Sequence, residues 1–225
     1  MSKKLQEKQR KRLAEQMRRD QQRKAARRSN LITLALAVLI LGIVAIAVVM
    51  QNGGDAPPAP KGVAAADAGC DPIEEPEEAG NEHVDPSEQV DYETRPPTSG
   101  DHWPTEFLVD PAFYPEIVEE EGLVHNMEHG HVIVWYKPDA PGETVSELEE
   151  FTKAANHEDA LSAGAISPII TVPYDAIDES KSYVLTAWNA TQACARYSLD
   201  AINNFRERFQ GRGPENAGIP TFENE

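Results

Sequence analysis

The stretch His131–Lys137, which reads HVIVWYK, decides the fold. It is rich in β-branched and aromatic residues, a composition typical of a strand buried in a core. The turn-forming residues PDAPG follow it directly at 138–142. We therefore expect a buried strand that ends at this loop.

The segments after the loop predict the rest of one domain. A helix is expected from Thr144, because Thr144 and Glu147 have the spacing of a capping box and apolar residues follow at helical intervals. Two strands, 167–174 and 182–190, come next, and apolar residues three to four positions apart predict a second helix over 198–209. This order predicts an α+β fold in which a small sheet is covered by helices.

The regions around these elements set the expected domain bounds. Residues 70–210 are predicted to form the α+β domain, and their first part, 70–100, is Pro-rich and without periodicity. Residues 51–69 are rich in Gly, Ala and Pro and predict a disordered linker. Residues 211–225 are expected to be a C-terminal tail.

An uncharged apolar run, Leu31–Met50, lies before the linker. Its 20 residues would span about 30 Å as a helix, which matches the hydrocarbon core of a bilayer. Lys and Arg crowd residues 1–30, so the positive-inside rule places that basic tail in the cytoplasm. The run predicts a transmembrane helix in a single-pass protein of the cell membrane, whose C-terminal domain is extracytoplasmic. A cleaved signal peptide is the alternative, but its basic and apolar parts are shorter.

Charge divides the chain into two unlike regions. Residues 1–30 hold 12 Lys and Arg against 3 Asp and Glu, whereas the other 195 residues hold 9 against 35. The basic tail is therefore expected either to act as a topology signal alone or also to attract anionic lipids. The acidic remainder repels phosphate, so we expect no nucleic-acid partner for the outer domain.

The chain has two cysteines, Cys70 and Cys194. An oxidising compartment outside the membrane favours their pairing as a structural disulfide.

The densest group of chemically active side chains is the sequence VHNMEHGH at 124–131. Two imidazoles would share one face if 125–129 is a helical turn, or if His129 and His131 begin a strand. Imidazole binds copper and zinc, and a thioether adds preference for Cu(I). The alternative is that these side chains only hold an irregular turn by hydrogen bonds. The candidate metal ligands are His102, His125, Met127, Glu128, His129 and His131.

Ser99 and His102 allow a third interpretation, a hydrolase with a nucleophile and base oriented by Asp101 or Glu128. The chain lacks the Gly-x-Ser-x-Gly nucleophile elbow, and Thr98–Asp101 is equally a turn that satisfies its own backbone.

Three motifs together resemble a known family. They are Pro96–Trp103 (PPTSGDHW), Val124–Val132 (VHNMEHGHV) and Leu185–Trp188 (LTAW), and they resemble the family known as domain of unknown function 3105. Its members look like membrane-anchored or secreted proteins of bacteria and fungi. They share a Pro-Pro-x-x-Gly-x-His segment and a Val-His-x-Leu-Glu-His-Gly segment. The resemblance covers about residues 70–210.

The resemblance implies a shared site at His102, His125, Glu128 and His129. Met127 stands where Leu is usual in the family, and His131 stands where the residue varies. The leading hypothesis is thus a membrane-anchored domain whose His-rich site binds copper or zinc. The alternatives are a non-enzymatic envelope or interaction domain with structural histidines, and a hydrolase.

Overall fold

A computed structural model describes residues 58–161, 166–215 and 217–223. The predicted basic tail, transmembrane helix and first linker residues, 1–57, lie outside these ranges. Among the described residues, no helix is both long and apolar enough to cross a membrane.

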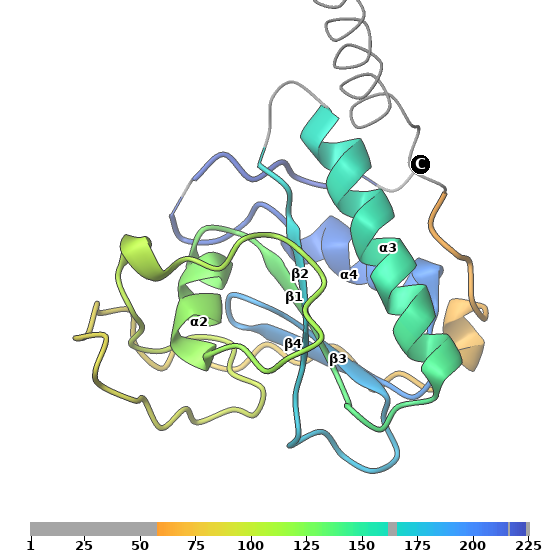
Figure 1. Ribbon diagram of the computed structural model, residues 1–225, viewed down its shortest axis with the longest axis horizontal. Helices are drawn as coiled ribbons and strands as arrows, with labels where there is room; N and C mark the ends of the chain where they lie inside the picture. Colours follow the sequence, from red (N-terminus) through yellow and green to blue (C-terminus); the bar gives the residue numbers. More distant parts are fainter. Residues whose placement is uncertain (1–57, 162–165, 216, 224–225) are drawn as a thin grey trace, which may run out of the picture. The chain divides into compact units, whose positions relative to one another are not determined.

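A mixed sheet forms the centre of the described part of the chain (Figure 1). Its strands lie in the order β2-β1-β3-β4, so that β1 is flanked on both sides. β1 is parallel to β2 and antiparallel to β3, and β3 is antiparallel to β4. The strands are β1 (Val132–Tyr136), β2 (Ile169–Pro173), β3 (Tyr183–Ala187) and β4 (Ala190–Cys194). Every residue of β1 is buried, as the composition of this segment predicts.

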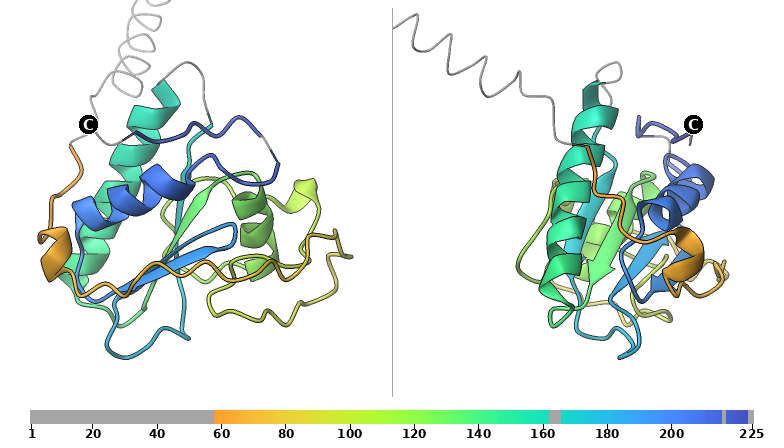
Figure 2. Two further views of the ribbon diagram at one scale, coloured as in Figure 1. Left: turned by 180° about the vertical axis from the view of Figure 1, so that it is seen from behind. Right: turned by 90° about the vertical axis from the view of Figure 1, so that its right-hand side faces the viewer.

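Two helices cover one face of the sheet, α3 (Gly142–Leu161) and α4 (Leu199–Phe209) (Figure 2, left). Alternate residues of β1, such as Val134, face them, because side chains alternate across a strand. The contacts on this face come from Phe151 of α3 and Phe205 of α4, among others. Ser198 caps α4 by accepting a hydrogen bond from the backbone of Ala201.

The helix α2 (Glu120–Glu128) covers the opposite face. In Figure 1 the sheet separates α2 from α3. The apolar side chains of α2 pack on those residues of β1 and β2 that point away from α3 and α4. This second core cluster includes Leu123, Met127, Ile133 and Trp135. The expected α+β architecture, a small sheet covered by helices, is confirmed for the described residues.

Two elements differ from the sequence-based expectation. The predicted strand 182–190 is a hairpin, in which β3 ends at Ala187 and β4 begins at Ala190. Asn189 has φ 55° in the two-residue turn, a conformation that Asn tolerates in tight hairpins. The sequence did not predict β4, because its half-exposed, partly polar residues form no apolar run. The other difference is α2, of which the sequence indicated only one turn.

The described parts of the expected linker and tail are bonded to the domain, which the sequence did not indicate. Residues 58–69 contact α4 and the segment before it, with Val63 donating to the carbonyl of Tyr197 and Leu199 donating to that of Lys61. In the tail, Gly211 donates to Gly130. Isolated backbone hydrogen bonds, rather than an apolar face, attach both segments to the domain. Such bonds require no apolar periodicity in the sequence.

Cys70 and Cys194 form a disulfide, as expected. The bond lies beside the edge of β4, where Asp71 donates a backbone hydrogen bond to Ala193. It ties the start of the domain to its last strand across 124 positions of sequence.

Replacing both cysteines by serine should lower the free energy of unfolding by about 4–5 kcal/mol, because the cross-link restricts a long loop in the unfolded chain. Chemical denaturation of the full-length chain measures this. A reductant should lower the unfolding midpoint of the wild type to that of the variant and leave the midpoint of the variant unchanged. Equal midpoints for the variant and the oxidised wild type would contradict the expectation.

Candidate functional site

The polar face of α2 is buried beneath an irregular segment, residues 82–110, which is called the covering segment. Glu121, His125 and Glu128 are spaced four and three residues apart, which places them on one face of the helix. All residues from Glu121 to Glu128 are buried. Since α2 packs on the sheet through its apolar side chains, its polar side chains must find partners in the segment that covers them.

Two further histidines reach this face from the covering segment. His102 donates its backbone N–H to the carbonyl of Glu82, and its own carbonyl accepts from Val84. This pairing sets His83 beside His102. His102 is fully buried, whereas His83 is exposed.

The imidazole rings of four histidines are in contact. The ring of His125 stacks on that of His83 at a centroid distance of 4.9 Å, and lies edge-on to that of His102, also at 4.9 Å. The ring of His129 contacts His125 from the other side, at 4.6 Å. His125 is therefore the centre of the cluster.

Backbone carbonyls fix the orientation of the two fully buried rings. Nδ1 of His102 lies 2.8 Å from the carbonyl oxygen of Gly100, and Nδ1 of His125 lies 2.6 Å from that of Trp103. A carbonyl oxygen only accepts hydrogen bonds, so each Nδ1 carries the proton and donates. In the neutral rings Nε2 then has a free lone pair, the form in which imidazole binds metals.

The lone pair of His102 meets a carboxylate. Nε2 of His102 lies 3.0 Å from Oε2 of Glu128, and both side chains are buried. Two acceptors at this distance repel one another. The contact needs either an additional proton or a metal cation between the two atoms.

Burial also keeps His125 neutral. It lowers the pKa of His125 to about 4, against the opposing effect of the hydrogen bond to Trp103, and the neighbouring histidines lower it further. At pH 7 the His125 ring is thus a lone-pair donor at Nε2.

The C-terminal segment adds a carboxylate on the open side of the cluster. Nε2 of His129 lies 3.1 Å from Nε2 of His125 and 3.1 Å from Oε2 of Glu215. Glu215 is placed there by its backbone N–H, which donates to the carbonyl of Glu128. The approach requires glycine at 213, because a Cβ there would collide with that same carbonyl oxygen.

Two overlapping sets of side chains in the described residues lie close enough together to hold a metal ion. Within each set, one possible ligand atom per residue lies within 4.8 Å of all the others. The sets share two residues on α2, His125 and Glu128. The first set is His83, His102, His125 and Glu128, and the second is His125, Glu128, His129 and Glu215.

The structure brings together four of the six predicted ligands, His102, His125, Glu128 and His129. Met127 points to the sheet, where its sulfur accepts a hydrogen bond from Thr186. His131 donates from Nδ1 to the carbonyl of Asn126, and its Nε2 is buried without a partner.

The Ser99 hydroxyl does not pair with His102. Its oxygen accepts a hydrogen bond from the backbone of Ala79, while the ring nitrogens of His102 contact Gly100 and Glu128. This arrangement differs from the nucleophile and base pair that the hydrolase interpretation requires.

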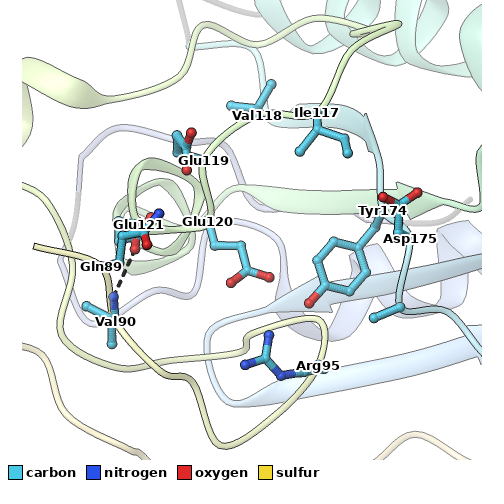
Figure 3. A pocket seen from close by; sticks show the side chains of 11 residues that line it. Gln89, Val90, Arg95, Ile117, Val118, Glu119, Glu120, Glu121, Tyr174 and Asp175 are labelled. Carbon is cyan, nitrogen blue, oxygen red and sulfur yellow. Dashed lines mark hydrogen bonds between the residues drawn. The ribbon is translucent and has the colours of Figure 1, made fainter.

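A cavity of about 390 Å³ is lined by the middle of the covering segment, the start of α2 and the residues that follow β2 (Figure 3). Arg95, Glu120 and Tyr174 point toward one another in it. Burial and the hydrogen bond with Glu120 raise the pKa of Tyr174 to about 12. Because these central polar groups satisfy one another, the cavity offers fewer free recognition groups than the histidine cluster.

The histidine motifs coincide with a known family. The sequence profile described as "Protein of unknown function (DUF3105)" matches residues 83–221, more than half of the chain. The chain belongs to the DUF3105 family. It matches no curated protein and no solved structure. The match begins at His83 and includes Glu215, so the DUF3105 region contains both ligand sets.

Sequence reasoning missed His83 and Glu215 as candidate ligands. Both lie far from the 124–131 motif in sequence, and they reach it only through backbone pairing. The sequence carried one weak signal for His83, its membership of the five histidines that precede the first strand. Glu215 is one of many acidic residues and carried none.

Replacing Glu128 by glutamine tests the acceptor–acceptor contact. The amide nitrogen of the introduced glutamine can donate to Nε2 of His102. We therefore expect the free energy of unfolding of the chelator-treated variant to exceed that of the chelator-treated wild type by about 1 kcal/mol. Chemical denaturation of the full-length chain measures it.

Glu121→Gln is the matched control on the same helix. Glu121 already accepts a hydrogen bond from the backbone of Val90, so its replacement should bring no gain. A loss of about 2 kcal/mol for Glu128→Gln would instead show that Glu128 pairs with a protonated His102.

Proposed function

We propose that the DUF3105 domain binds a transition-metal ion through a ring nitrogen of His83, Nε2 of His102 and His125, and the carboxylate of Glu128. The observation that carries the proposal is the 3.0 Å contact between Nε2 of His102 and Oε2 of Glu128. Two neighbouring ligands of one ion, each about 2.0–2.2 Å from it, lie about 3.0–3.4 Å apart.

The hydrogen bonds behind the rings support the same proposal. A histidine that binds a metal through Nε2 usually donates its Nδ1 proton to a carbonyl or carboxylate, which fixes the tautomer and the ring plane. His102 and His125 both have this partner, at Gly100 and Trp103. The donors would therefore be oriented before the metal binds.

The donor set favours zinc or Cu(II). Three imidazoles and a carboxylate suit these borderline cations, whereas Cu(I) prefers sulfur. The sulfur of Met127 is directed to Thr186, and both cysteines form the disulfide. Within the described residues, the cluster thus contains nitrogen and oxygen donors.

The full-length chain, purified in detergent, loaded with Zn²⁺ and desalted, should retain at least one equivalent by elemental mass spectrometry. Zinc at 100 times its dissociation constant should raise the free energy of unfolding by about 2.7 kcal/mol. His83→Ala should lose the ion that the first ligand set holds, together with the stability that this ion adds, and so should a His102→Ala/His125→Ala variant.

His157→Ala is the control, because His157 lies on α3, outside both ligand sets. His83 is exposed, so its replacement tests a ligand without disturbing the core. A folded wild-type chain that retains neither Zn²⁺ nor Cu²⁺ would leave these histidines with a purely structural role, as in an envelope or interaction domain.

We further propose that residues 31–50 anchor the chain in the cell membrane as a single span, with the basic residues 1–30 facing anionic lipids in the cytoplasm. The disulfide between Cys70 and Cys194 supports an extracytoplasmic position for the domain, because such bonds persist in oxidising compartments.

A fusion of alkaline phosphatase to the C-terminus tests this topology in a bacterial host. The enzyme is active only outside the cytoplasm, so we expect high activity that fractionates with membranes. The same fusion lacking residues 1–50 should be inactive. Activity in the soluble periplasmic fraction would instead indicate cleavage after the apolar run.

A further inference from the structure

The second ligand set has its own adjacent donor pairs. Nε2 of His129 is 3.1 Å from both Nε2 of His125 and Oε2 of Glu215. These separations equal those expected between neighbouring ligands of one ion. Nε2 of His129 can carry at most one proton, although two acceptors face it, Nε2 of His125 and Oε2 of Glu215.

One ion cannot reach all six side chains. Ligands on opposite sides of a single ion are at most about 4.4 Å apart, given bonds of about 2.0–2.2 Å. The six residues form two sets rather than one, so at least some donors that the sets do not share lie more than 4.8 Å apart. An ion in the first set therefore leaves donors of the second set outside its shell.

His125 and Glu128, the two residues common to both sets, differ in the number of ions that each can bind. His125 has a single available donor atom, Nε2, because Nδ1 donates to the carbonyl of Trp103. It can bind one ion at a time. The carboxylate of Glu128 has two oxygens and can bridge two ions, and its negative charge reduces the repulsion between them.

We propose that the cluster is a dinuclear centre, with a second ion held by His125, His129 and Glu215. His83 and His102 retain the first ion, and Glu128 bridges the two, which places them about 3.5–4 Å apart. This inference rests on the proposed function, because the second ion shares Glu128 with the first. Three or four protein donors for each ion leave positions open to water.

Loading the full-length chain with Cu²⁺ tests the pair by count and by distance. Elemental mass spectrometry should find two copper ions per chain. Electron paramagnetic resonance should show the half-field transition of two coupled Cu²⁺ ions, a signal that isolated copper sites lack.

A His129→Ala/Glu215→Gln variant should retain one copper ion and lose the half-field transition. Both side chains are partly exposed, so the fold should tolerate the change. Glu207→Gln, an exposed carboxylate on α4, is the matched control and should keep two coupled ions. His83→Ala/His102→Ala should also lose the coupled signal.

The outcomes separate the two proposals. One ion in the wild type, lost in His83→Ala/His102→Ala but kept in His129→Ala/Glu215→Gln, overturns the dinuclear centre and leaves the proposed function standing. Two ions without magnetic coupling overturn the centre as well, because the second ion is then elsewhere. No retained metal overturns both.

Discussion

Hydrogen bonds between side chains of α2 and the backbone of the covering segment hold this half of the domain together. Residues 82–110 contribute little regular structure, so their buried N–H and C=O groups need other partners. α2 provides them: Glu121 accepts from Val90, the amide of Asn126 pairs with both backbone groups of Val109, and His125 donates to Trp103. The apolar side of the same helix completes the core beneath β1.

Hydrogen bonds from ring nitrogens to the backbone of the covering segment also orient the histidine cluster. A ring that donates Nδ1 to a backbone carbonyl has its tautomer and its plane fixed by that bond. For His102 and His125, the donation that satisfies the covering segment also directs Nε2 toward Glu128 and His129. The proposed metal-binding role therefore falls on side chains that also have a structural role, and a loss of stability on mutation says little about function without a metal readout.

Apolar patterns made three strands and two helices predictable, whereas the remaining parts depend on contacts distant in sequence. β1, β2, β3, α3 and α4 carry a run or a period of apolar residues that a single sequence displays. β4 is a polar edge strand, and α2 has polar residues buried on one side, so neither has a clear period. His102, His125 and Glu128 were recognisable from their motifs, but His83 and Glu215 join them only through backbone pairing at residues 82–84 and 128–130.

Glu121 and Glu128 offer a comparison within one helix. Both lie on the same face of α2, and each residue is 4% exposed. Glu121 accepts a hydrogen bond from a backbone N–H, as a buried carboxylate should. Glu128 faces Nε2 of a ring whose proton is committed to the other nitrogen. Burial under the covering segment is common to both, so it does not explain the difference between them. An additional proton or a cation between Glu128 and the ring accounts for the difference, and the proposed metal site is the second of these cases.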